Sequence, residues 1–160
     1  MKEHFIELIR RAATVLPEDV SRAIQRAARR EPGGSAARSA LSDVVTNCKM
    51  AAESSRPLCQ DTGTNIWYVH HPASVPQKEI EKAILAATRV ATKKAYLRPN
   101  AVDPITGKNS GDNTGAGAPV IHMHQWNRKS IAADLLLKGG GSENVSATYS
   151  LPDGEIEAGR

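Results

Sequence analysis

One short stretch, residues 57–64, constrains the fold of this sequence more than any other, and it reads Pro-Leu-Cys-Gln-Asp-Thr-Gly-Thr. Pro57 fixes its own φ and Gly63 permits a positive φ, so the stretch is a shaped loop rather than part of a helix or strand. It divides the chain into a helical region over residues 1–56 and a mixed region over 57–150. Any fold must therefore present a loop that carries a thiol, an amide and a carboxylate.

The region before this loop contains three amphipathic helical patterns. Apolar residues fall on one stripe over residues 2–16, which predicts the first helix. Pro17 begins a second helix, because proline suits the first helical turn, and the Glu-Pro-Gly-Gly run at 31–34 ends it. Ser35 is the expected N-cap of a third helix over 36–54.

The region after the loop mixes strands with a helix. Residues 65–71 alternate in the manner of a strand, and residues 77–95 form the strongest helical pattern in the chain. A polar, glycine-rich segment over 98–119 is long enough to predict a loop that either lines a site or is mobile. Three further strands are expected, at 120–126, 130–137 and 145–150, with the first two joined as a hairpin through 127–129.

These elements predict a fold of the α/β class, mixed α+β, in which the N-terminal helices pack on a small, largely antiparallel sheet. Three polar loops, at 57–64, 98–117 and 138–144, each join regular elements. Loops of this kind are often held by a scaffold around one cleft, so we expect glycine-rich active-site loops on one side of the sheet.

Composition narrows the classes of function. The 160 residues correspond to one domain, and much of the net charge of +4 comes from arginines on the first two helical patterns. Only 4 % of the residues are aromatic, which argues against a base-stacking surface for nucleic acid. We expect no membrane span and no signal peptide, and two cysteines with different surroundings predict no disulfide framework. These features together predict a cytoplasmic protein.

The two cysteines are placed differently. Cys48 falls in the apolar stripe of the 36–54 helix, where a free cysteine behaves as a small hydrophobe, so we expect it in the core. Cys59 has no such stripe and precedes Asp61 by two residues. A thiolate prefers iron in sulfide clusters, zinc or Cu(I), and a nearby carboxylate can move protons beside such a metal. A turn with a buried cysteine is the alternative interpretation.

Two more loops carry groups that suit a small anion. Arg98 precedes a proline, which restricts its backbone, and a guanidinium can bind a carboxylate with two parallel N–H groups. The three glycines after Lys138 expose backbone N–H groups. With the 57–64 loop, these features predict a small anionic substrate handled by a metal. A zinc site at His122 and His124, on one strand face, is a remote alternative.

Four runs together resemble the N-terminal part of class I (iron–sulfur) fumarases, in the form found as a separate alpha subunit and shared with tartrate dehydratase. They follow the family order over nearly the whole chain. The runs are residues 57–64, then Leu-Arg-Pro-Asn-Ala-Val-Asp-Pro at 97–104, Gly-Asp-Asn-Thr at 111–114 and Lys-Gly-Gly-Gly-Ser-Glu-Asn at 138–144.

The resemblance implies a hydro-lyase of the tricarboxylic acid cycle that reversibly adds water to fumarate to give L-malate. It also implies a [4Fe-4S] cluster held by three cysteines, with one iron left open as a Lewis acid. By this resemblance Cys59 is a metal ligand, Asp61 is catalytic and contacts the substrate with Gln60, and Arg98 binds a substrate carboxylate. Further substrate contacts are implied for Gly139, Gly140, Gly141, Ser142 and Asn144.

The resemblance places the other two cluster cysteines beyond Arg160. We therefore expect residues 1–160 to be the N-terminal part of an iron–sulfur hydro-lyase alpha subunit that is inactive alone. Its expected partners are a dicarboxylate substrate and a beta subunit or the C-terminal part of the same enzyme, in an oligomer. The Gly-Ser-Glu-Asn run favours fumarase, and tartrate dehydratase is the alternative. A non-catalytic binding or scaffold module with an incidental thiol is a third hypothesis.

Overall fold

The structure is a computed structural model that describes residues 1–103 and 105–139. The strand expected at 145–150 lies outside the described residues. Four helices and three strands follow in the order α1 (Lys2–Thr14), α2 (Glu18–Arg30), α3 (Ala36–Ser54), β1 (Thr64–His71), α4 (Gln77–Lys93), β2 (Val120–Gln125) and β3 (Ala132–Lys138). The α/β class is therefore confirmed, and the helices and strands predicted within the described residues are all present.

The sheet has the order β2-β1-β3, with β1 parallel to β2 and antiparallel to β3. It is mixed, and the hairpin predicted between β2 and β3 is wrong because β1 lies between them. The connection over residues 126–131 passes the end of β1, where the Trp126 N–H donates to the His71 carbonyl at 3.0 Å. Six residues are long enough to step across two strand spacings of about 4.8 Å each. β1 is the central strand, and both side chains that it contributes to the core cluster, Trp67 and Val69, are fully buried.

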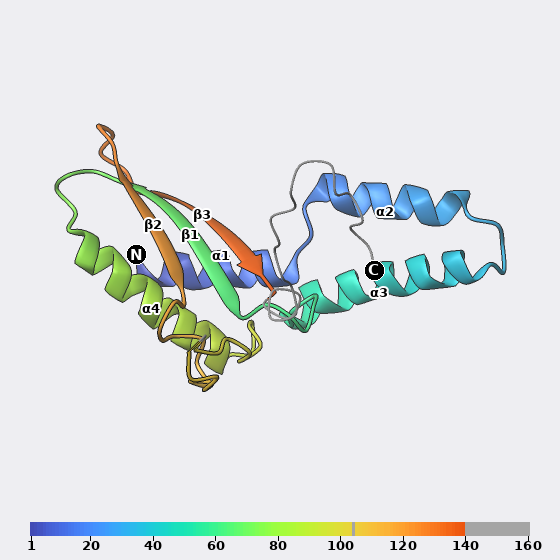
Figure 1. Ribbon diagram of the computed structural model, residues 1–160. Helices are drawn as coiled ribbons and strands as arrows, with labels where there is room; N and C mark the ends of the chain where they lie inside the picture. The colour runs from blue at the N-terminus through green and yellow to red at the C-terminus, as the bar shows by residue number, and fades with distance from the viewer. Residues whose placement is uncertain (104, 140–160) are drawn as a thin grey trace, which may run out of the picture.

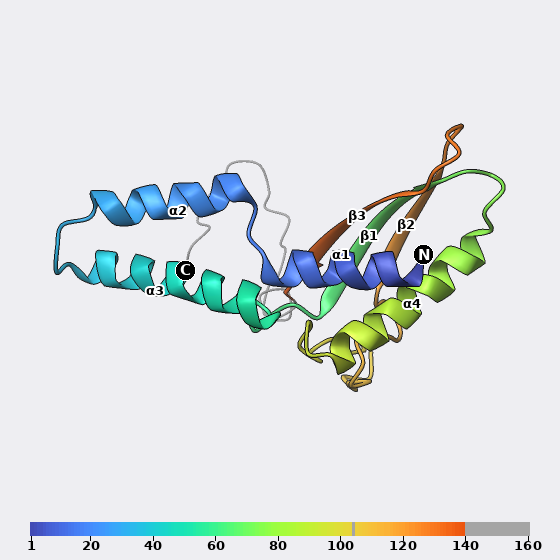
Figure 2. The same ribbon diagram turned by 180° about the vertical axis from the view of Figure 1, so that it is seen from behind.

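One face of the sheet is covered by α1 and α4, which pack against each other (Figures 1 and 2). Their bulky apolar side chains form the core with Trp67, whose ring meets that of Phe5 edge-on at 5.2 Å between centroids. Ile9, Ile80 and Ile84 are fully buried there. The core thus sits between two helices and the inner face of β1.

The helices α2 and α3 lie side by side and project away from the sheet as a hairpin (Figure 1). Of the three N-terminal helices, only α1 packs on the sheet, because its stripe carries Phe5, Ile6 and Ile9, whereas α2 buries none of its residues. Among the described residues, no helix has the length and apolar character needed to cross a membrane.

Candidate active site

The register of the sheet brings the ends of two predicted loops together. Thr64, the first residue of β1, pairs with Lys138, the last residue of β3, so the end of the 57–63 loop lies beside Gly139. A Cβ added at Gly139 would overlap the carboxylate of Asp61. Asp61 therefore packs directly against the backbone that leaves β3, and a side chain at position 139 would displace its carboxylate.

The segment after α4 closes on the same loop from another side. The Asn100 side-chain amide donates to the Gln60 carbonyl at 3.0 Å and to Asp61 Oδ1 at 3.2 Å. The Arg98 backbone N–H donates to Thr62 Oγ1 at 3.2 Å. Three separate segments therefore meet at Asp61, which is the arrangement expected for the polar loops.

Gly63 is required for a reason other than the predicted one. Its φ is not positive, but a Cβ at this position would overlap the Asn100 amide oxygen and lie 2.9 Å from the Ala101 nitrogen. Real Cβ atoms essentially never approach backbone that closely, so any larger residue would push the two loops apart. Gly63 allows close backbone approach rather than a left-handed turn.

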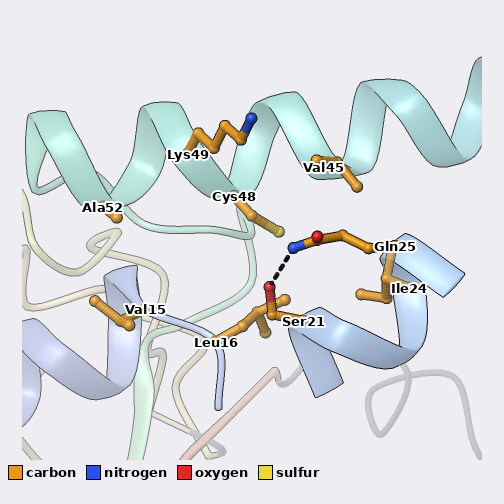
Figure 3. A pocket seen from close by; sticks show the side chains of 9 residues that line it. All are labelled: Val15, Leu16, Ser21, Ile24, Gln25, Val45, Cys48, Lys49 and Ala52. Carbon is orange, nitrogen blue, oxygen red and sulfur yellow. Dashed lines mark hydrogen bonds between the residues drawn. The ribbon is translucent and has the colours of Figure 1, made fainter. Parts of the chain in front are cut away.

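Cys59 is exposed on this loop, and its sulfur accepts a hydrogen bond from the Asp61 backbone N–H at 3.4 Å. An exposed thiol held next to a carboxylate is available to a metal, so the alternative of a buried cysteine is wrong. Cys48 is half-buried and lines a hollow between α2 and α3 rather than the main core (Figure 3). The α2–α3 hairpin leaves its seam partly open, which explains why that core position was predicted incorrectly.

The described residues do not form a metal site by themselves. No group of three or more His, Cys, Asp or Glu side chains within residues 1–103 and 105–139 could hold a metal ion. His122 and His124 instead stack their rings on Tyr68 and His70, at 4.8 and 5.3 Å between centroids. The zinc alternative therefore finds no support there, and Cys59 fits a metal or cluster as one ligand among several.

Arg98 is exposed, and its guanidinium makes no ion pair within the part of the chain that the structure describes. Its backbone is held on both sides: the N–H binds Thr62, and the carbonyl accepts from Asn113 Nδ2 at 2.8 Å. The guanidinium is thus attached to a fixed backbone while remaining open to an anion. Gln60 is likewise exposed, and its carbonyl is bound by Asn100.

Asn113 is the residue that sequence reasoning missed. Its side chain is fully buried, accepts from the Ala101 N–H at 3.1 Å and donates to Thr92 Oγ1 at 3.1 Å as well as to the Arg98 carbonyl. Its φ is 60°, a left-handed value that asparagine tolerates. The run Gly-Asp-Asn-Thr at 111–114 was a signal for it, since asparagine and aspartate often bind nearby backbone in turns. Asn113 ties the segment with Arg98 and Asn100 to the end of α4.

Asp112 completes the attachment of this segment. Partial burial raises the pKa of its carboxyl, but the hydroxyl and N–H of Thr114, with smaller contributions from Ser110 and the Arg89 guanidinium, outweigh burial and lower that pKa below its ordinary value. The Thr114 hydroxyl donates at 2.7 Å and Arg89 Nε at 3.3 Å. The ionised carboxylate therefore links the loop to the outer side of α4.

The predicted site residues that the structure describes are Cys59, Gln60, Asp61, Arg98 and Gly139. Asp61 lies against Gly139, and its backbone N–H donates to the Cys59 sulfur. Its carboxylate accepts from the Asn100 amide, which joins it to the segment that carries Arg98. Gly140, Gly141, Ser142 and Asn144 lie outside the described residues. The contacts among the described residues can hold a thiolate, a carboxylate and a guanidinium on one set of loops.

Comparison with known proteins matches the chain to the family described as Fumarate hydratase (Fumerase) over residues 2–159. A Geobacillus stearothermophilus protein named as a fumarate hydratase class I is 44 % identical over 99 % of this chain and 31 % of its own length. A Methanocaldococcus jannaschii protein named as an L(+)-tartrate dehydratase subunit alpha is 36 % identical over 95 % of this chain and 55 % of its own length.

A third relative is the L(+)-tartrate dehydratase subunit alpha of Escherichia coli K12, which is 33 % identical over 59 % of this chain and 32 % of its own length. The chain therefore spans between about a third and about half of the length of these curated relatives. With nearly every residue matched, the chain belongs to the fumarate hydratase (Fumerase) family.

Proposed function

We propose that this chain is the N-terminal part of the alpha subunit, or alpha region, of an iron–sulfur hydro-lyase that reversibly hydrates fumarate to L-malate. The observation that carries the proposal is the meeting of three loops at Asp61, beside an exposed thiol, in a chain of this family. A structural turn needs neither a free thiol nor a carboxylate at its centre. A site for a metal and a small acid uses both.

The chemistry of the loop fits a [4Fe-4S] cluster with Cys59 as one ligand. The sulfur is exposed, and a thiolate is the ligand that such clusters take. The sequence has only two cysteines, and Cys48 faces the α2–α3 seam, so the other cluster thiolates are contributed by another part of the enzyme. When bound, the cluster supplies an open iron that acts as a Lewis acid on a substrate oxygen.

The chain's own residues then bind and orient the acid. Asp61 moves the proton at a substrate carbon, because its carboxylate is fixed by the Asn100 amide and by the backbone at Gly139. The exposed Arg98 guanidinium binds a substrate carboxylate and stabilises the negative charge that builds up beside it. Gln60 contributes a further polar contact. Gly140, Gly141, Ser142 and Asn144 remain proposed substrate contacts.

Tartrate is the second candidate substrate, since two of the relatives are named as tartrate dehydratase subunits alpha. The greater identity to the fumarate hydratase class I favours fumarate. Rates of the complete enzyme, this chain assembled with the beta subunit or C-terminal part, should be measured on fumarate and L(+)-tartrate at equal concentrations. A higher kcat/KM for fumarate supports the proposal, and a higher value for tartrate replaces the substrate.

The 160-residue chain alone should neither hold a full cluster nor hydrate fumarate, because it cannot supply three cysteine ligands around one site. The test is reconstitution of the chain with ferrous iron and sulfide under anaerobic conditions, followed by iron analysis and a malate assay. Four irons per chain together with malate formation by this chain unaided would refute the proposal that another part of the enzyme supplies the remaining cluster ligands. If the complete enzyme also turns over neither acid, the non-catalytic module is the better reading.

A further inference from the structure

The exposed Cys59 lies between α3 and β1, outside any helix or strand, so its position depends on individual hydrogen bonds. The end of α1, the end of α3 and the start of β1 meet at this place in the molecule (Figures 1 and 2). A metal ligand needs a fixed orientation, which residues around it normally supply. The neighbours of this cysteine therefore decide how well it can serve as a ligand.

The segment that leads from α3 to Cys59 turns back along the helix. It turns at Ser55, which follows the last residue of α3 with a left-handed φ of 50°. Asn47 lies seven residues before the end of the helix at Ser54, a rise of about 10 Å, and the four residues 55–58 can span about 13 Å. Leu58 is thereby returned to the level of Asn47.

Leu58, the residue before Cys59, is held at both of its backbone groups. Its N–H donates to the Ala13 carbonyl at 2.9 Å, and its carbonyl accepts from Asn47 Nδ2 at 3.1 Å. Ala13 is buried in the core cluster near the end of α1. A carbonyl can only accept, so the amide nitrogen of Asn47 and not its oxygen must face Leu58. The two bonds join Leu58 to α1 and to α3.

The residue after Cys59 is held in the same way from another part of the fold. The Gln60 carbonyl accepts from Asn100 Nδ2 at 3.0 Å. The carbonyls on either side of the cysteine are thus each bound by an asparagine amide, one from α3 and one from the segment after α4. We name these two hydrogen bonds the asparagine clamp.

The bond from Asn47 serves the position of the loop more than the stability of the chain. Asn47 is exposed in the interior of α3, where alanine has the higher helix propensity. Replacing it by alanine therefore gains propensity while it loses one hydrogen bond, and these effects on the free energy of unfolding largely offset each other. What is lost without compensation is the hold on the Leu58 carbonyl, next to the cysteine.

We propose that Asn47 is a positioning residue for the Cys59 thiolate. Together with Asn100 it fixes the backbone on both sides of the cysteine, so that the sulfur is held in one place for a cluster. The inference rests on the proposed function, in which Cys59 is a cluster ligand. It extends that function to a residue outside the 57–64 loop, on a helix of the α2–α3 hairpin.

The first test measures the clamp without a cluster. Amide hydrogen exchange of Leu58 in the 160-residue chain, followed by NMR, reports how often its N–H leaves the Ala13 carbonyl. Because two bonds hold the same residue, Asn47→Ala should speed this exchange about threefold to tenfold, the factor that loss of one ordinary hydrogen bond produces. Asp43→Ala is the matched control, since Asp43 is exposed one turn earlier on α3 and has a similar helix propensity. It should leave the exchange unchanged.

The second test measures the cluster in the complete enzyme. Transfer of iron to a ferrous chelator under anaerobic conditions should be about tenfold faster in Asn47→Ala, the size typical of residues that orient metal ligands. Asn47→Asp keeps the shape of the side chain but turns an acceptor toward the Leu58 carbonyl, so its iron loss should be faster still. Asp43→Ala should release iron at the parent rate. The urea midpoints of Asn47→Ala and Asp43→Ala should be alike.

The outcomes separate this inference from the proposed function. If Asn47→Ala resembles Asp43→Ala in either the exchange of Leu58 or the release of iron, Asn47 does not position the cysteine. Faster iron loss that merely follows a lowered urea midpoint also overturns the inference, because it shows a role in stability alone. A parent enzyme that holds no cluster overturns the proposed function instead. Leu58 exchange in the 160-residue chain then decides by itself whether Asn47 holds the loop of the thiol.

Discussion

Replacing Asn113 by alanine should destabilise the chain by about 3–5 kcal/mol. The amide is fully buried, and its loss leaves the Ala101 N–H unpaired, at about 1–2 kcal/mol for a partly buried group. It also removes the bonds to Thr92 Oγ1 and to the Arg98 carbonyl, which keeps its bond from the Asn100 N–H at 2.9 Å, at about 0.5–1 kcal/mol each, so about 2–4 kcal/mol is expected for the amide. Alanine at a φ of 60° adds about 1 kcal/mol, because its Cβ disfavours the left-handed region.

Urea unfolding followed by tryptophan fluorescence and far-ultraviolet circular dichroism measures this loss. Asn113→Gly is the matched variant: it loses the amide but accepts the positive φ, so it should be about 1 kcal/mol more stable than Asn113→Ala. Asn127→Ala, at an exposed turn position, is the surface control. If Asn113→Ala costs no more than Asn127→Ala, the amide does not hold the segment that carries Arg98 and Asn100.

Three other predictions concern the loops around Asp61. Gly63→Ala should destabilise the chain by about 1–3 kcal/mol in the same urea assay, because its methyl group would meet the Ala101 backbone, whereas Gly33→Ala, with open space around it, should be near neutral. Gly139→Ala should reduce kcat of the complete enzyme about a hundredfold by displacing the Asp61 carboxylate, while the free energy of unfolding changes little. An unchanged kcat would show that Asp61 does not take part in the reaction. The pKa of Asp112 is lowered in the folded state, so the ionised carboxylate stabilises the fold. This contribution to the free energy of unfolding is full above the unfolded pKa of about 4 and is lost as pH falls through the lower folded pKa. Asp112→Asn should therefore make stability depend less on pH in this acid range.

Local sequence patterns were sufficient to predict the helices and strands but not which strands pair with each other. The stripe of Phe5 and Ile9 and the alternation around Trp67 report directly which side of an element is buried, and those side chains form the core. Strand order depends on which neighbour offers the better cover, which no local pattern encodes. For that reason the turn at 127–129 suggested a hairpin, while β1, whose inward side chains are buried, took the place between β2 and β3.

Site residues could be predicted where the side chain itself indicates chemistry. They could not be predicted where the role depends on contacts that form only in the fold. Cys59, Asp61 and Arg98 stood out because a thiol, a carboxylate and a guanidinium in shaped loops carry chemistry by themselves. Asn113 and Asn100 have ordinary amides, and their roles arise only from contacts between segments distant in sequence, such as the Asn100 bond to Asp61. Gly63 was correctly expected to be a special position, although its reason is close packing against Ala101.

The central claim is that Cys59, and not Cys48, holds iron beside Asp61, and visible absorption with iron analysis of the complete enzyme tests it most directly. Cys59→Ser should lose the broad absorption of the [4Fe-4S] cluster and the hydration of fumarate together. Cys48→Ser is the matched control, because its sulfur lines the α2–α3 seam, and it should keep both. A Cys59→Ser enzyme that retains four irons and its cluster spectrum would contradict the account.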